Sequence, residues 1–294
     1  MITDAPRLTL RHGSLELVLA PAEGGAIAAF RADQFDLMRA CPPRGVAPLD
    51  MACFPLVPFS GRIGYGRFRW QGRTVELERG LPDEPHAIHG DGWLGSWTVT
   101  ERTDRSATLL FMRTAPWLPF RYRAEQRFAL ADGLLRATIA VTHLGDRPMP
   151  YGIGLHPYFD RRPGVTLSAD VEAVWWPDAA GIAHELRPIP PELDFRTPRA
   201  VDTLEMDHNF AGFAGRALID FTAERMRLTI EADPVFGTLV VYVPPGQDFF
   251  CVEPTSHAAD VVNMPPGQRL DPGLRVLGPG ETLAGEVRLR VSQP

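Results

Sequence analysis

Five polar side chains lie in short segments that could carry acid–base chemistry. His89 lies in AIHGDGW and His156 in PYGIGLHPYF, where glycines, prolines and aromatic residues surround each imidazole. Glu253 ends the apolar run DFFCVEP, Asp207 opens DHNF, and Arg62 lies in PFSGRIGYGRF between glycines that let a backbone approach a ligand. A carboxylate and an imidazole can take and give protons near neutral pH when burial shifts their pKa values. These five residues therefore form a candidate acid–base set.

Each of these residues also has an ordinary structural explanation. A histidine among aromatic residues is often a hydrogen-bonded core or turn residue, and a glutamate before a proline often ends a strand at the surface. Arg62 could be a rim arginine, and Asp207 could form an Asx turn. We interpret the remaining turn and strand-end histidines, His12, His143 and His184, as structural. The sequence alone does not bring the five candidates together in space.

A metal site is a second chemistry that the histidines allow. His86, His89, His156 and Glu253 form a candidate ligand set, but HxxH in a loop lacks the helical context of the zinc motif HExxH. Neither a GxSxG elbow nor an activated cysteine favours a covalent nucleophile. The phosphate-binding patterns GxxxxGK[ST] and GxGxxG are also missing from the sequence. We therefore expect no metal and no cofactor.

Composition restricts the class of protein further. The chain has 294 residues, 45% of them hydrophobic, which is enough for one large core. A net charge of −6 and scattered arginines argue against a nucleic-acid partner. The start MITDAPRLTL does not read as a signal peptide, and no stretch approaches the ~20 apolar residues of a membrane helix. Cys41, Cys53 and Cys251 are typical of reduced thiols, so we expect a cytoplasmic protein without a membrane partner.

The apolar pattern predicts strands and almost no helix. Apolar and polar residues alternate on both sides of three turn dipeptides, at residues 12–13, 71–72 and 132–133, which is the pattern of β-hairpins. Residues 226–230 also alternate, and the continuous apolar run 239–243 suits a strand buried on both faces.

The 29 prolines and 27 glycines divide the chain at short intervals, as turns between strands do. Prolines are most frequent between Pro177 and Asp207, where we predict a long loop packed over one face. Without a linker or charge block, the chain is expected to form one all-β domain over residues 1–294, a large antiparallel β-sandwich.

Five segments, in this order along the chain, resemble motifs of the aldose 1-epimerases, also called galactose mutarotases. GRIGYGRF at 61–68 is similar to the arginine-bearing segment of the family, and AIHGDGW at 87–93 and LHPYF at 155–159 are similar to its two histidine motifs. MDHNF at 206–210 resembles the aspartate motif, and CVEPTSHAADVVN at 251–263 resembles the segment that carries the glutamate. The resemblance implies the galactose mutarotase-like supersandwich fold.

The resemblance also implies roles for the five residues. Glu253 would be the general base that takes the proton of the anomeric hydroxyl, and His156 the general acid that protonates the ring oxygen. His89 and Arg62 would hold the sugar, and Asp207 would bind its hydroxyls. The partner would be a small-molecule sugar, without metal or cofactor, and the protein would be a monomer or a homodimer.

Aromatic residues could supply apolar faces for the sugar. The candidates are Trp93, Tyr158 and Phe210, each next to one of the motif residues, although core packing is the commoner role of such side chains.

One departure from the family pattern concerns the substrate. Gly61 stands where many members have asparagine, which removes a hydroxyl contact. A hexose-6-phosphate 1-epimerase is an alternative, and it would need a cationic cluster such as Arg121 with Arg123 or Arg161 with Arg162. A non-catalytic carbohydrate-binding protein is another, but it would need no matched acid and base. A metal-dependent, cupin-like isomerase is the last.

Overall fold

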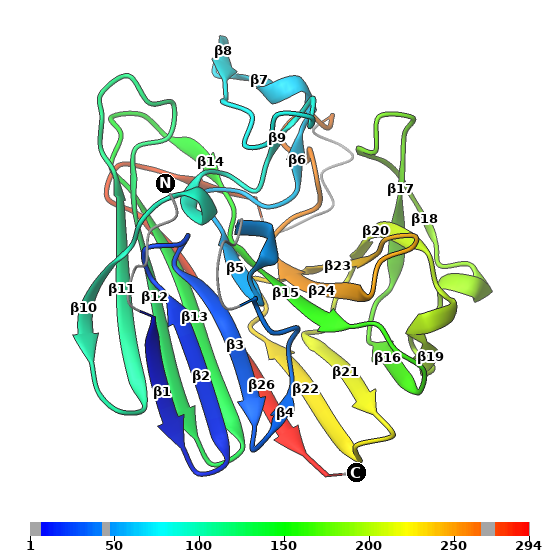
Figure 1. Ribbon diagram of the computed structural model, residues 1–294. Coiled ribbons are helices and arrows are strands. Elements are labelled where there is room, and N and C mark those ends of the chain that lie inside the picture. Colours follow the sequence, from blue (N-terminus) through cyan, green and yellow to red (C-terminus); the bar gives the residue numbers. More distant parts are fainter. Residues whose placement is uncertain (1–6, 43–47, 266–273, 294) are drawn as a thin grey trace.

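The computed structural model describes residues 7–42, 48–265 and 274–293. Within these residues, two large antiparallel sheets pack against each other, and Figure 1 shows β1 to β3 beside β10 to β13 in the left half of the view. The first six residues, part of the segment in which we found no signal peptide, lie outside the described residues.

Among the described residues, no helix has the length and apolar character needed to cross a membrane.

The first sheet carries the candidate residues His156, Asp207 and Glu253. Its order is β1-β2-β3-β5-β15-β24-β23-β20-β17-β18, and β4 pairs with β3. The strands are β1 (Leu8–His12), β2 (Leu15–Ala20), β3 (Ala26–Ala32), β4 (Phe35–Asp36), β5 (Cys53–Leu56), β15 (Gly154–Asp160), β24 (Phe249–Thr255), β23 (Thr238–Val243), β20 (Met206–Ala211), β17 (Ala173–Pro177) and β18 (Ala183–Pro188).

The second sheet supports the first, and short pairs and turns connect the two. The second sheet runs in the order β10 (Thr98–Arg102), β11 (Ser106–Arg113), β12 (Tyr122–Ala131), β13 (Leu134–His143), β26 (Thr282–Ser292), β22 (Met226–Ala232), β21 (Arg216–Phe221), β16 (Val165–Ala169) and β19 (Arg199–Ala200). Two-stranded pairs are β6 (Arg62–Ile63) with β9 (Ala87–Ile88), β7 (Arg67–Trp70) with β8 (Arg73–Glu76), and β14 (Met149–Tyr151) with β25 (Arg275–Leu277). Short 3-10 turns are η1 (Pro48–Asp50), η2 (Gly64–Gly66), η3 (Gly92–Leu94), η4 (Pro191–Leu193) and η5 (Val201–Thr203).

The three hairpins predicted from alternation are confirmed. β1 pairs with β2, β7 with β8, and β12 with β13, each across its expected turn. Gln71 and Gly72 both have positive φ, 46° and 77°, as a tight hairpin turn between right-twisted strands requires. The run 239–243 lies in β23, which is buried along most of its length, as expected for a strand covered on both faces.

The prediction of a long loop between Pro177 and Asp207 is wrong. This stretch contains β18, η4, β19 and η5, and β20 has already begun at Met206. β18 and β19 are the outermost strands of the first and second sheets. Edge strands tolerate proline because one side of the strand needs no hydrogen-bond donors, so Pro188 can end β18 there. Pro177 ends the inner strand β17 beyond its last pairing with β20, at Trp175.

The two faces of the first sheet pack against different parts of the protein. One face packs on the second sheet in a single apolar core, with Phe30, Phe159 and Val241 fully buried. Gln126 of the second sheet donates from its amide to the carbonyl of Gly25 at 2.9 Å and helps to join the sheets. This arrangement confirms the all-β sandwich.

The other face carries a separate apolar cluster that includes Phe54, Tyr158 and Cys251 from the sheet, with Ile88 and Trp93 from the connecting segments that cover it. Burying a side chain such as Phe54 stabilises the fold by roughly 1.5–3 kcal/mol. Candidate residues on this second face can therefore be buried without belonging to the main core.

Gly90 allows the chain to approach Val57 closely. A Cβ at Gly90 would lie 2.2 Å from the Val57 carbonyl oxygen, and the residue has a φ of 70°. Gly72 has a similar φ of 77°, but its Cβ would have no heavy atom within 4 Å.

We expect Gly90→Ala to lower the free energy of unfolding by about 3 kcal/mol, because it adds a backbone clash to left-handed strain. The matched control Gly72→Ala should lower it by only about 1–2 kcal/mol, the cost of the strain alone. Urea unfolding of both variants measures the difference, and equal losses would contradict the close approach.

Candidate active site

The pairing of β15 with β24 places the candidate acid and base opposite each other. The register aligns Gly154 with Thr255 and Tyr158 with Cys251, so His156 and Glu253 face each other between them. His156 Nε2 lies 3.3 Å from Glu253 Oε1, and the two side chains are only 6% and 4% exposed. Both residues lie inside strands.

Arg62 and Asp207 complete one side of the site. Asp207 in β20 is paired with Tyr242 in β23, which is paired in turn with Cys251 in β24, so these residues share a face of the sheet. Arg62 in β6 donates from Nη1 to Asp207 at 3.2 Å and from Nε to Glu84 at 3.2 Å. The guanidinium is thus held between two carboxylates beside Glu253.

His89 approaches from the segment that covers the sheet. It follows β9 with a φ of 61°, and its backbone N–H donates to the Gly61 carbonyl at 2.9 Å. Its ring stands perpendicular to that of His156, with 5.1 Å between the centroids. The turn therefore presents a second imidazole to the His156–Glu253 pair.

Aromatic rings fix the orientation of His156. The imidazole lies 4.5 Å from the Phe54 ring and is stacked on Tyr158 at 4.7 Å. Trp93 stacks on Phe54 at 5.2 Å. Phe210, which we considered as a sugar-contacting ring, is fully buried in the main core on the opposite face, so that interpretation is wrong.

Comparison with known proteins identifies the family. A family model described as aldose 1-epimerase matches residues 6–290. The chain belongs to the aldose 1-epimerase family.

Relatives of this family member are similar over nearly their whole length. The uncharacterized protein YphB of Escherichia coli K12 is 36% identical over 291 residues, which cover 96% of this chain and 98% of YphB. A crystal structure from E. coli K12, provisionally assigned as an aldose 1-epimerase, is 36% identical with a TM-score of 0.91, covering 98% of this chain and 99% of that one.

A galactose mutarotase-like protein from Clostridium acetobutylicum has a TM-score of 0.86 at 18% identity, with 97% of this chain and 95% of that one covered. At this identity the likeness concerns the fold, and it confirms the galactose mutarotase-like sandwich.

Burial shifts the protonation of this epimerase-family site. Burial, together with the negative charge of Asp207, raises the pKa of Glu253 well above its usual value, and Arg62 partly opposes this shift. Burial also lowers the pKa of His156 to about 3. The pKa of His89 is well below its usual value through burial and through the neighbouring His156 and Arg62. Burial thus favours the neutral forms of the two imidazoles and of Glu253.

The ion pairs of Arg62 with Asp207 and Glu84 favour the protonated guanidinium. Burial alone would lower the pKa of the guanidinium, but Asp207 and Glu84 raise it overall. Arg62 thus stays cationic at the edge of a buried site.

The four candidate metal ligands, which the sequence allowed but did not favour, are not brought together as one set. His86 is engaged elsewhere, because its Nδ1 accepts the Tyr65 backbone N–H at 2.9 Å and its Nε2 lies 3.1 Å from the Ala180 carbonyl. Among the described residues, ligand atoms of His156, Cys251 and Glu253 do lie within 4.8 Å of one another. However, burial raises the pKa of the Cys251 thiol well above its usual value, which disfavours the thiolate that a metal requires.

Sequence reasoning missed several residues of the site. Glu84, in DEPH just ahead of the His89 motif, could have been noticed as a partner for an arginine. Arg39 lies over the Tyr158 ring at 4.2 Å, and the sequence around it gave no signal. Asn209, two residues after Asp207 on the same strand face, accepts the Ala259 backbone N–H at 2.9 Å.

Two of the histidines interpreted as structural have partners that fit this interpretation. The buried His143 contacts the Tyr151 hydroxyl at 2.7 Å and the Arg147 carbonyl at 2.6 Å. His12 lies 2.8 Å from Asp132, so it connects the tips of two hairpins.

Asp207 and Arg62 should shift the pKa of Glu253 in opposite directions. We expect Asp207→Asn to lower this pKa, because a negative charge is removed, and Arg62→Gln to raise it, because a positive charge is removed. A ¹³C NMR titration of the glutamate carboxyls, with the Glu253 signal assigned from Glu253→Gln, measures both shifts. Shifts of the same sign in the two variants would contradict the arrangement.

Proposed function

We propose that this protein interconverts the α and β anomers of a free aldose, with Glu253 as general base and His156 as general acid. The observation that carries the proposal is the buried pair of a carboxylate and an imidazole, 3.3 Å apart, beside Arg62 and Asp207. Membership of the aldose 1-epimerase family supports the same reaction.

The spacing of the pair suits the reaction. The anomeric hydroxyl and the ring oxygen of a sugar are bonded to the same carbon, so the groups that deprotonate one and protonate the other must be neighbours. Glu253 takes the hydroxyl proton, the C1–O1 bond becomes a carbonyl, the C1–O5 bond breaks, and His156 delivers a proton to O5. Rotation about C1–C2 and closure on the other face of the carbonyl then return both protons. Positioned acid–base groups of this kind typically contribute ~10²–10⁴-fold each.

The reaction requires one proton shared by Glu253 and His156. Burial alone favours this proton on Glu253. A bound sugar favours the other arrangement, because its anomeric hydroxyl donates to a carboxylate and its ring oxygen accepts from a protonated imidazole. Sugar binding thereby sets the base and the acid in their working states.

The remaining residues hold the sugar. Arg62 and His89 lie on the segments that cover the sheet, where they can bind sugar hydroxyls and stabilise negative charge near the ring oxygen. Asp207, on the sheet itself, accepts hydrogen bonds from sugar hydroxyls. Asn209 shares this face and offers an amide nitrogen. At Gly61, which has a φ of 62°, a Cβ would lie 3.1 Å from Ala259, so this position has little room for a side chain.

The phosphate alternative is less well supported. Arg121 pairs with Asp146, Arg162 pairs with Glu224, and Arg161 donates to main-chain carbonyls. None of these contacts involves a residue of the described site. A free sugar, which needs no cationic cluster, is therefore the substrate class that we favour.

Glu253→Gln should reduce mutarotation by about 10²–10⁴-fold, because the amide cannot take the hydroxyl proton. Sugar affinity should change little, since glutamine keeps the size and much of the polarity of glutamate. Polarimetry of freshly dissolved α-D-glucose and α-D-galactose measures the rate, and calorimetry measures the affinity. Glu125→Gln on the second sheet is the matched control, and full activity of Glu253→Gln would refute the mechanism.

Incubation with EDTA should leave the mutarotation rate unchanged, because acid–base ring opening needs no Lewis acid and the Cys251 thiol is a poor ligand. Loss of activity that returns with added Zn²⁺ would instead support a metal held by His156, Cys251 and Glu253. The cytoplasmic location, the single domain and the monomer or homodimer stay predictions from the sequence.

A further inference from the structure

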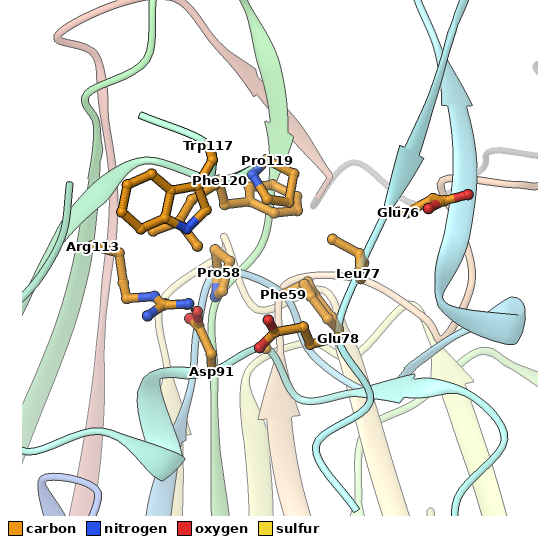
Figure 2. A pocket seen from close by; sticks show the side chains of 12 residues that line it. Pro58, Phe59, Glu76, Leu77, Glu78, Asp91, Arg113, Trp117, Pro119 and Phe120 are labelled. Atoms are coloured by element: carbon orange, nitrogen blue, oxygen red, sulfur yellow. Dashed lines mark ion pairs between the residues drawn. The ribbon is translucent and has the colours of Figure 1, made fainter. Parts of the chain in front are cut away.

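A second pocket lies outside the candidate active site. It has a volume of about 230 Å³ and lies between the chain after β8, the β11–β12 connection and the turn that follows His89. Figure 2 shows Trp117, Pro119 and Phe120 on one side of it and Pro58, Phe59, Glu78 and Asp91 on the other. Its volume is below the ~300–1,000 Å³ of pockets for drug-sized ligands, so it suits one small ring.

The apolar wall of this pocket contains an unusually exposed tryptophan. Trp117 is 81% exposed, whereas Phe120 on the same side is 6% exposed and Phe59 on the other side is 5% exposed. An indole at the rim of a pocket offers a large, rigid apolar face at low entropic cost. The pocket therefore has one surface suited to the C–H face of a flat, partly apolar ring.

The opposite side of the pocket also carries charged groups. Arg113, the one arginine of the lining, is paired with the carboxylate of Asp91. Asp91 accepts from the Tyr122 hydroxyl and pairs with Arg113, with 2.6 Å between Asp91 Oδ2 and Arg113 Nε. Glu78 extends toward Asp91 in Figure 2, and Glu76 lies further out. Three carboxylates and one guanidinium give the lining a net negative charge. This charge disfavours an anionic ligand, and the carboxylates and the paired guanidinium offer hydrogen-bond acceptors and donors to the hydroxyls of a neutral one.

We infer that this pocket binds a neutral pyranose ring, with Trp117 stacked on its C–H face and Glu78, Asp91 and Arg113 bonded to its hydroxyls. An aromatic face opposite several hydrogen-bonding groups matches a molecule with one apolar face and a polar edge. The inference does not depend on the proposed mutarotation, because the lining contains none of the five candidate site residues.

The sugar ring can belong to a free monosaccharide or to the end of a glycan. Trp117 also borders a second hollow of about 440 Å³, lined in part by Trp70, Arg73 and Asp146. A chain of two or more rings could therefore extend past the indole, and a longer ligand would bind more tightly if it uses both hollows.

The test is a ¹⁹F NMR titration of the full chain labelled with 5-fluorotryptophan. The protein has six tryptophans, so the signal of each can be assigned by substitution. Trp117 reports on the second pocket, and Trp93, which stacks on Phe54, reports on the candidate active site. The two sites are read separately, so failure of one proposal is distinguishable from failure of the other.

The neutral probes are methyl β-D-glucopyranoside, whose anomeric centre is locked, and the disaccharide cellobiose. We expect both to shift the Trp117 signal in a saturable way, and glucose 6-phosphate and choline to leave it unchanged. Tighter binding of cellobiose would identify a glycan end, and equal binding would identify a free sugar.

The exposed Glu78 allows a variant that leaves the core intact. Glu78→Ala should weaken binding of the neutral sugars at Trp117 about tenfold, as expected when a charged hydrogen-bond acceptor is lost. Met112→Ala, an exposed neighbour of Arg113 that does not line the pocket, should bind as the wild type does. A Trp117 signal that responds to neither neutral sugar, that responds to choline, or that titrates equally in Glu78→Ala would overturn the inference.

Discussion

The register between β15 and β24 is the constraint on which the rest of the site depends. Antiparallel pairing aligns residues on both sides of His156 and Glu253, and so it sets an imidazole and a carboxylate opposite each other on one sheet face. Both are buried, which raises the pKa of Glu253 and lowers the pKa of His156. The charges of Asp207 and Arg62 shift the pKa of Glu253 in opposite directions. The rings of His89, Phe54 and Tyr158 pack around the imidazole of His156.

The segments that cover this face of the sheet contribute the remaining two candidate residues, Arg62 and His89. Arg62 lies in β6 and His89 directly follows β9, which pairs with β6, and the hydrogen bond from the His89 N–H to the Gly61 carbonyl joins these two segments beside the site. Positive φ at His89 and Gly90 lets the chain turn sharply where it meets the sheet. The same turn continues to Asp91, whose contacts with Tyr122 and Arg113 connect it to the second sheet. The position of His89 therefore depends on both sheets.

Much of this arrangement could be predicted from the sequence, and the failures have physical reasons. Alternation and turn dipeptides located the hairpins, because both are local properties of the chain. Five ordered motifs named the candidate residues that the structure brings together, although the motifs did not place His156 and Glu253 within strands. Phe210 was misassigned because its face depends on which residues of β20 point inward, a property set by partners far along the chain. Glu84 and Arg39 meet the site only through tertiary folding, and prolines on edge strands were mistaken for a loop.

Both faces of the first sheet are packed, and this limits where residues can be inserted into or deleted from the chain. Successive side chains of a strand point to opposite faces, so one residue gained or lost within β24 would send Glu253 toward the apolar core and a core residue toward the pocket. The same holds for His156 in β15. Insertions and deletions that keep the protein active must therefore fall in the connections between strands. The connections that cover the candidate site are where such changes can reshape it while His156 and Glu253 stay opposite each other.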